Sequence, residues 1–200
     1  MPACRLAAHD LACRRGDRVL FTGLELALGG GEALHLAGPN GIGKSSLIRI
    51  LAGLLRPFAG TVEREGALAL LDERPALDVH LPLARALGFW MRFDRVSDEA
   101  LDGAIGALGL RDLLDVPVRY LSTGQRKRAA LARVLLGGAP VWLLDEPLNG
   151  LDTASAAAVE RLAAEHCAGG GIAVIASHQP FALTGMARLE LAGFAPAEAA

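Results

Sequence analysis

The chain has 200 residues, of which 52% are hydrophobic and 21% are charged, and its formal net charge is −2. This length and apolar content predict one compact domain with one substantial core, and the near-neutral charge excludes the broad positive surface of a dedicated nucleic-acid-binding protein. The first residues, Met1–Arg5, are not a basic region followed by an apolar core, so we expect no signal peptide and a cytoplasmic protein.

The first element with a clear chemical meaning is a glycine-rich loop, which follows a short apolar strand candidate, Ala33–Ala37. Glycines let backbone N–H groups wrap around a polyphosphate, the Lys44 ammonium reaches the β- and γ-phosphates, and the Ser45 hydroxyl can ligate Mg²⁺. Only two of the 20 Lys and Arg residues are lysines, and the broad fork of arginine does not substitute here. The predicted ATP-binding residues are Gly38, Pro39, Asn40, Gly41, Ile42, Gly43, Lys44, Ser45 and Ser46.

A helix is expected directly after this loop, which places the phosphates at a helix N-terminus. Apolar residues recur there at helical spacing, and a proline closes the segment. These residues are Leu47, Ile48, Ile50, Leu51, Leu54 and Pro57.

The next segment combines a helix start with an unusual run of positive charge. Ser122 is a natural N-cap, and apolar residues follow at helical spacing, at Leu131, Val134 and Leu135. Three cations, Arg126–Arg128, crowd the first turn, where the helix dipole is already positive and each cation costs roughly 0.3–1 kcal/mol. Either a bound anion offsets this cost, or three solvated side chains tolerate it; the run alone does not distinguish the two.

Further along, a strand candidate ends in two acids. Val141–Leu144 are apolar and predict a buried strand, Asp145 and Glu146 follow, and Pro147 stops the strand. Open α/β sheets bind ligands at the carboxyl ends of their strands. Consecutive side chains point to different sides, so Asp145 can address a Mg²⁺ shell while Glu146 faces a water in line with the γ-phosphate. A solvated turn is the alternative, and the upstream phosphate-binding loop favours the catalytic interpretation.

The longest stretch without a formal charge, His166–Ala187, is not a membrane span, because glycines and a proline interrupt it. Within it, Ile172–Ala176 predicts a buried strand of a parallel sheet, and His178 follows shortly after. The cysteines are odd in number and lack metal-ligand spacing, so we interpret them as small apolar residues. They are Cys4, Cys13 and Cys167.

Taken together, these motifs resemble those of the ATP-binding cassette (ABC) ATPases, in both order and spacing. His178 stands where the family has a histidine after its last core strand, and Asn149 and Asp152 fall in a segment that resembles the D-loop. The segment that is similar to the family's signature is Leu121, Ser122, Thr123, Gly124 and Gln125.

The resemblance spans nearly the whole chain and implies a single ABC ATPase domain of the α/β class with a P-loop NTPase fold. It implies a mostly parallel core sheet, an antiparallel β portion near the N-terminus and an inserted helical subdomain. Residues 1–75 and 136–200 would form the nucleotide-binding core, and residues 76–135 the helical subdomain that carries the signature.

The resemblance also implies a role for each site residue. Two copies of the domain close head to tail, so that Ser122 and Gly124 of one copy contact the γ-phosphate held by the other. Glu146 is implied as the general base or water-positioning group, and His178 as a γ-phosphate contact. Mg²⁺ with ATP is the implied cofactor.

The metal contacts implied in this way are Ser45 and Asp145. Taken alone, His178 has a second interpretation as a structural histidine.

Two departures from the family pattern stand out. The segment Ala12–Gly16 has no aromatic residue to stack on adenine, so Arg14 or Arg15 can stack instead. The Q-loop glutamine, expected after a strand near Ala67–Leu71, is missing, because that segment continues Asp72-Glu73-Arg74-Pro75. The details of metal coordination and of coupling to a membrane partner are therefore open.

The segment Phe89–Phe93 gathers two of the six phenylalanines and one of the two tryptophans. In family transporters, a groove in this region receives a helix of the membrane subunit, which is one interpretation. The other is the small core of the helical subdomain, and one helix can serve both purposes.

Within the family, the segments Val19–Leu24, Arg49–Pro57 and Leu144–Asp152 look like those of haem exporter ATPases of cytochrome c maturation. This resemblance implies a CcmB-like membrane permease with a CcmC-like protein, a peripheral location at the cytoplasmic face of the bacterial inner membrane, and no direct haem site or nucleic-acid contact. The alternatives are an exporter of a lipid, metal or drug and, on weaker grounds, a soluble ABC protein acting on nucleic acid or ribosomes. The cargo is chosen by a membrane subunit, so this chain alone does not identify it.

Overall fold

Antiparallel strands form a sheet from the N-terminal part of the chain. The computed structural model describes residues 3–73, 76–94 and 96–196. In it, β1 (Arg5–Arg15) pairs antiparallel with both β2 (Arg18–Gly29) and β4 (Ala59–Glu65). The strand order is β2-β1-β4, so the expected antiparallel portion is confirmed.

A second, parallel sheet forms the centre of the molecule, with the strand order β5-β6-β7-β3-β8 and only parallel pairs. The predicted strands over 33–37, 141–144 and 172–176 are confirmed. The strands of this sheet are β3 (Ala33–Ala37), β5 (Leu68–Leu71), β6 (Val141–Asp145), β7 (Ile172–Ala176) and β8 (Ala187–Glu190).

The central strands of the parallel sheet, β3, β6 and β7, are buried on both faces. Val141 and Leu143 pack into the core shared with α1 and the antiparallel sheet, whereas Trp142 and Leu144 pack into a core on the opposite face. Consecutive strand side chains point to opposite faces, which explains why β6 is apolar without interruption until Asp145.

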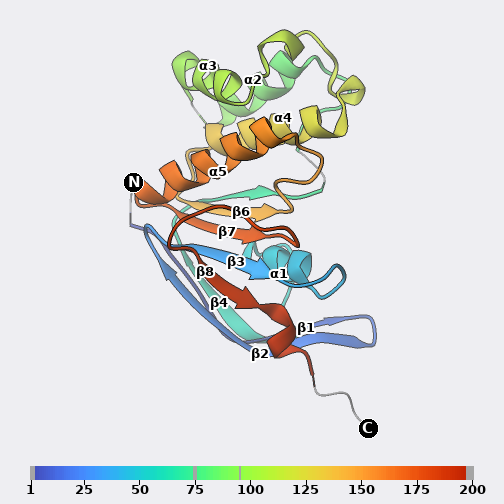
Figure 1. Ribbon diagram of the computed structural model, residues 1–200, viewed down its shortest axis with the longest axis vertical. Helices are drawn as coiled ribbons and strands as arrows, with labels where there is room; N and C mark the ends of the chain where they lie inside the picture. Colours follow the sequence, from blue (N-terminus) through green and yellow to red (C-terminus); the bar gives the residue numbers. More distant parts are fainter. Residues whose placement is uncertain (1–2, 74–75, 95, 197–200) are drawn as a thin grey trace.

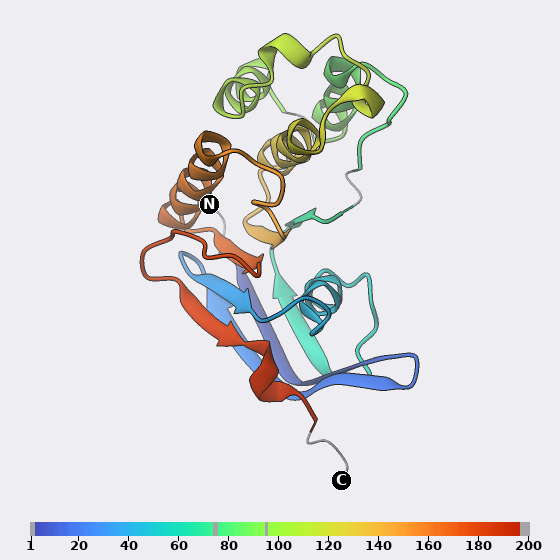
Figure 2. The ribbon, with the colours of Figure 1, turned by 45° about the vertical axis from the view of Figure 1, so that its right-hand side comes forward.

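The helices cover the sheet in two layers (Figure 1). One helix, α1, lies between the two sheets, while α4 and α5 cover the other face of the parallel sheet. Figure 2 shows α2 and α3 stacked on α4, at the end of the molecule far from the antiparallel sheet. The helices are α1 (Lys44–Leu51), α2 (Leu83–Asp94), α3 (Asp98–Ala107), α4 (Thr123–Leu136) and α5 (Thr153–Ala168), with 3₁₀ turns at Arg111–Leu113, Val118–Tyr120 and Leu191–Phe194.

Helix α1 is shorter than its apolar pattern predicts. It ends at Leu51, and Gly53 then adopts a positive φ of 76°, a conformation that glycine enters without strain. Leu54 is 66% exposed, so its inclusion in the helical apolar face is wrong.

The aromatic cluster on α2 divides between core and surface. The Trp90 indole donates to the Ala76 carbonyl at 2.6 Å, and the Arg133 guanidinium lies 4.0 Å from its ring centroid. Phe89 and Phe93 are 61% and 72% exposed. The segment therefore supplies both a packed tryptophan and an apolar surface.

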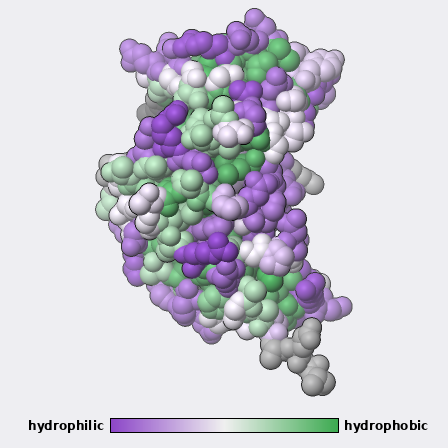
Figure 3. Space-filling model, in the orientation of Figure 1, coloured by the Kyte–Doolittle hydropathy of each residue, from purple (hydrophilic) through white to green (hydrophobic). Residues whose placement is uncertain are grey.

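Hydrophilic and hydrophobic residues are interspersed over the face seen in Figure 3. None of the described helices combines the length and the apolar character that crossing a membrane requires. Cys4, Cys13 and Cys167 are buried free thiols, which agrees with their interpretation as small apolar residues.

A buried histidine lies where α5 crosses the parallel sheet. The His166 ring stacks on Trp142 with centroids 3.9 Å apart and an interplanar angle of 12°, and its Nε2 lies 3.2 Å from the Ile172 carbonyl oxygen. Burial lowers the pKa of His166, and hydrogen bonds with the carbonyls of Ile172 and Pro140 act in the opposite direction. The imidazole is therefore neutral in the folded protein at neutral pH.

This lowered pKa predicts a loss of stability in mild acid. Below the ordinary histidine pKa of about 6.5, His166 is protonated in the unfolded chain but stays neutral in the folded chain. The free energy of unfolding therefore falls by up to about 1.4 kcal/mol for each unit by which the pH is lowered. Denaturant unfolding at pH 7 and pH 5 measures this, and His166→Phe should reduce the pH dependence. An unchanged pH dependence in that variant would contradict the assignment.

Candidate functional site

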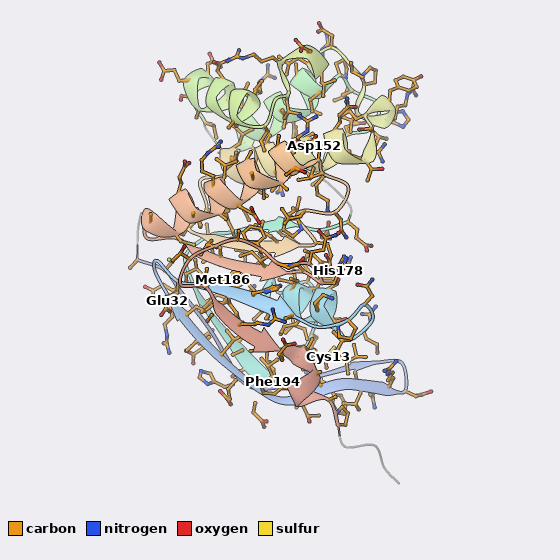
Figure 4. All side chains as sticks on the ribbon, viewed as in Figure 1. Cys13, Glu32, Asp152, His178, Met186 and Phe194 are labelled. Atoms are coloured by element: carbon orange, nitrogen blue, oxygen red, sulfur yellow. The ribbon has the colours of Figure 1, made fainter. Side chains whose placement is uncertain are left out.

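The site is built along one edge of the parallel sheet. Because β3, β5, β6 and β7 run parallel, their carboxyl ends meet at the same edge. The predicted phosphate-binding loop follows β3, Glu146 follows β6 and His178 follows β7. Figure 4 shows His178 at this edge and Asp152 at the start of α5.

The phosphate-binding loop enters α1 through a glycine with a left-handed backbone. Gly43 is the N-cap of α1 with φ 118°, and a Cβ there would lie 3.3 Å from Leu20. Lys44 is buried, and its Nζ donates to the carbonyl oxygens of Gly38 at 2.7 Å and Pro39 at 3.2 Å. The ammonium is thus held inside the loop by backbone oxygens.

Glu146 lies between two groups that can carry positive charge. Its Oε1 is 3.6 Å from Lys44 Nζ, and its Oε2 is 2.9 Å from His178 Nδ1. The Glu146 backbone has φ 47°, an uncommon left-handed conformation for a residue with a side chain. Strained backbones of this kind concentrate at functional sites, and this one turns the chain sharply at the end of β6.

Lys44 and Glu146 face a polar cleft of about 360 Å³, whereas His178 lines a separate pocket with Gly38 and Pro39. Glu73, which lies in the segment where the family has its Q-loop glutamine, lines the cleft; Arg74 and Pro75 of that segment lie outside the described residues. Among the described residues that line the cleft, none belongs to 121–125. The lining residues are Leu20, Asn40, Gly41, Gly43, Lys44, Ser45, Ser46, Glu73, Glu146 and Asn149.

Asp145 is a buried carboxylate beside the loop, 3% exposed. Burial raises the pKa of Asp145, and the charges of Glu146 and Glu73 raise it further, whereas a hydrogen bond from Ser45 and the charge of Lys127 lower it. Its Oδ1 has no hydrogen-bond partner among the described residues. An orphaned carboxylate oxygen beside a hydroxyl is a donor set that suits a hard cation such as Mg²⁺, so the residues fit the implied metal.

The signature segment is held by local contacts. Ser122 caps α4 with a reciprocal capping box, because Ser122 Oγ accepts from the Gln125 N–H and the Gln125 side chain accepts from the Ser122 N–H. A Cβ on Gly124 would lie 2.5 Å from the Gly150 carbonyl oxygen, so α4 packs closely on the segment after β6. Asp152 in turn caps α5 by accepting from the Ser155 N–H.

The cationic run at the start of α4 has protein partners. Arg126 donates to the carbonyls of Arg119 and Leu121, and Arg128 donates to the carbonyls of Leu108 and Gly109. The run is therefore neither fully solvated nor shown to need a bound anion.

The remaining cation of this run, Lys127, lies near carboxylates and not backbone carbonyls. Burial lowers the pKa of Lys127, and the charges of Asp145, Glu146, Glu73 and Asp72 oppose that lowering. The sequence interpretation grouped Lys127 with two arginines and gave it no separate role; the signal that could have set it apart is that Lys127 is one of only two lysines.

The two arginines proposed to stack on adenine face different surroundings. The Arg14 guanidinium lies 4.5 Å from the centroid of the Phe58 ring. Arg15 instead acts on Cys13, whose thiol forms a hydrogen bond with Ser46 of the phosphate-binding loop; burial raises the pKa of Cys13, and both Arg15 and Ser46 lower it. Of the two arginines, Arg15 is therefore the one near a side chain that contacts the phosphate-binding loop.

Comparisons with known proteins agree with this geometry. Residues 21–149 match the family model described as ABC transporter. The chain is 63% identical to the cytochrome c biogenesis ATP-binding export protein CcmA of Novosphingobium aromaticivorans, over 98% of this chain and 100% of that protein. It is 56% identical to the protein of the same name in Sphingopyxis alaskensis, over 89% and 92%.

A solved structure of an ATP-binding subunit of an ABC transporter has the same fold. It superposes with a TM-score of 0.78 at 23% sequence identity, and the match covers 86% of this chain and 79% of that one.

The close contact at Gly124 predicts that a single methyl group is costly there. Gly124→Ala should lower the free energy of unfolding by about 1–3 kcal/mol, because α4 must move away from the Gly150 carbonyl. Gly103→Ala in α3 is the matched control: its Cβ meets open space, so it should raise stability by about 0.5–1 kcal/mol. Urea unfolding of both variants measures the difference, and equal effects would contradict the packing argument.

Proposed function

This chain belongs to the ABC transporter family, and from that membership we propose that it is the ATP-hydrolysing subunit of an exporter that serves cytochrome c biogenesis. The observation that carries the proposal is the contact of Glu146 with both Lys44 and His178 at the carboxyl edge of the parallel sheet, in a chain 63% identical to a cytochrome c biogenesis export ATPase. We keep residues 76–135 as the helical subdomain and the remainder as the nucleotide-binding core.

ATP would bind with its phosphates at the N-terminus of α1. The backbone of residues 38–46 and the Lys44 ammonium would contact the β- and γ-phosphates. Ser45 and Asp145 would hold Mg²⁺, which supplies charge neutralisation on the phosphate oxygens. Arg15 is our candidate for the adenine contact.

Hydrolysis requires a free carboxylate on Glu146. In the present structure, Lys44 and His178 both hold that carboxylate. When phosphates take up the Lys44 ammonium and the His178 imidazole, Glu146 is released to orient a water and accept its proton. The same three side chains thereby provide both a resting arrangement and a reactive one.

A second copy of the chain would complete the site. Ser122 and Thr123 are exposed and none of the residues 121–125 reaches the cleft of its own chain. We propose that Ser122 and Gly124 contact the γ-phosphate held by the other copy, with Asn149 and Asp152 close to the shared interface.

The membrane partners follow from the named relatives. We propose that the chain binds a CcmB-like permease, together with a CcmC-like protein, at the cytoplasmic face of the bacterial inner membrane, and that the cargo is haem. The permease would bind the cargo. The second candidate, an exporter of another cargo, differs only in that partner.

The role of Glu146 is tested with a pair of variants. Glu146→Gln should keep ATP affinity within about twofold, lower turnover by about 100-fold or more because the proton acceptor is lost, and trap a dimer with two nucleotides. Lys44→Ala should instead weaken ATP binding by about 10- to 100-fold, since a charge-assisted contact to phosphate is removed. Nucleotide binding, phosphate release and size-exclusion chromatography report the outcomes. Near-normal turnover of Glu146→Gln would remove Glu146 from the catalytic role.

The identity of the exporter is tested by its partner. Purification of the full complex from membranes should recover a CcmB-like permease in amounts comparable with this chain. Recovery of a drug- or lipid-exporter permease in its place would overturn the haem proposal while leaving the ATPase proposal intact.

A further inference from the structure

Both lysines of this chain lie near the same group of carboxylates. Lys44 comes from α1 and contacts Glu146 directly. Lys127 comes from the first turns of α4; burial lowers its pKa, and the nearby charges of Asp145 and Glu146 oppose that lowering. The remaining basic side chains are all arginines.

Lys127 lines a second cavity, of about 300 Å³, together with Glu73 and Glu146. This cavity shares Glu73, Glu146 and Asn149 with the nucleotide cleft, so the two spaces adjoin. The residues that line it are Asp72, Glu73, Thr123, Arg126, Lys127, Ala130, Glu146, Asn149 and Gly150. One wall is thus the start of α4, and the other is the carboxyl edge of the sheet.

The carboxylates on that edge need a positive charge. Asp145 is buried with an orphaned Oδ1, and Glu73 and Glu146 lie close enough to raise its pKa. Lys127 is half-buried among them. A lysine suits this place because its ammonium is a compact point charge on a flexible stem, whereas the planar forks of Arg126 and Arg128 are turned to carbonyl oxygens.

We propose that Lys127 is a positioning residue that supplies the counter-charge of this carboxylate group before a metal ion binds, and so holds the signature helix α4 against the nucleotide-binding core of its own chain. The proposal rests on the proposed function, because it concerns the same Asp145 and Glu146. A divalent cation at Asp145 competes with Lys127 for the same negative charge. Metal binding therefore weakens the electrostatic attraction between the start of α4 and the carboxylates, and the first turn of α4 with Ser122 becomes free to turn toward a second copy.

The first test measures metal affinity without nucleotide. Mn²⁺ is the probe, because carboxylate oxygens bind it as they bind Mg²⁺, and the loss of its free EPR signal reports binding. Lys127→Met keeps the side-chain length, removes the charge and should tighten Mn²⁺ binding by about tenfold, since one nearby competing charge is gone. Lys127→Arg should stay within about threefold of the wild type. Circular dichroism shows that each variant is folded.

Arg128→Gln is the matched control, because it removes one positive charge from the same helix outside the cavity. It should leave Mn²⁺ affinity unchanged. Equal Mn²⁺ affinity in the wild type and Lys127→Met overturns the proposal, and so does an equal rise in Arg128→Gln, which would point to net charge alone.

A second readout follows the helix itself. Hydrogen exchange of the backbone amides in the first half of α4 should be at least about fivefold faster in nucleotide-free Lys127→Met than in the wild type. The reason is that the attraction between the Lys127 ammonium and the carboxylates of the core is lost. Unchanged exchange overturns the positioning role. Neither measurement uses ATP, so a failure here is distinct from a failure of the proposed ATPase function, which the Lys44→Ala binding assay reports.

Discussion

Parallel pairing of the central strands is the constraint on which the site depends. Each strand from β5 to β3 runs in the same direction, so every segment that leaves a carboxyl end emerges at one edge. Hydrogen bonding between neighbouring strands sets the spacing of those ends, and burial of both sheet faces fixes the register. A phosphate-binding loop, two acids and a histidine from distant parts of the chain are thereby brought to the same edge of the sheet.

The carboxylates at this edge lie near positively charged or protonatable side chains of the same chain. Glu146 is held by Lys44 and His178, and Lys127 faces the same carboxylates from α4. Within the cationic run of α4 the basic residues are used differently: Arg126 and Arg128 donate to backbone carbonyls, while Lys127 lies near carboxylates. A planar fork matches several fixed acceptors, whereas a compact ammonium can exchange one anionic partner for another. Exchange of partners is what a site that takes up and releases phosphate requires.

The start of α4 is held against this edge by local contacts. Gly124 of α4 packs on the Gly150 carbonyl, and the capping box formed by Ser122 and Gln125 fixes the entry of α4. These contacts place the signature beside the segment after β6 but outside the cleft of its own chain. Geometry of this kind leaves the signature available to a second copy.

Features that depend on a few neighbouring residues were predictable from the amino-acid sequence. The strands over 33–37, 141–144 and 172–176, the N-cap at Ser122 and the fold class were all predictable, because alternation, capping and glycine-rich loops act over a few residues. The end of α1 was not, since the apolar pattern continues to Leu54 while Gly53 turns the chain. The partners of long side chains became clear only from the three-dimensional fold: Arg126 and Lys127 are neighbours in one run, yet Arg126 donates to backbone carbonyls and Lys127 lies near carboxylates of the sheet edge. The reason is that a charged side chain pairs with whichever group lies next to it in the folded protein, and that group belongs to a segment far away in the sequence.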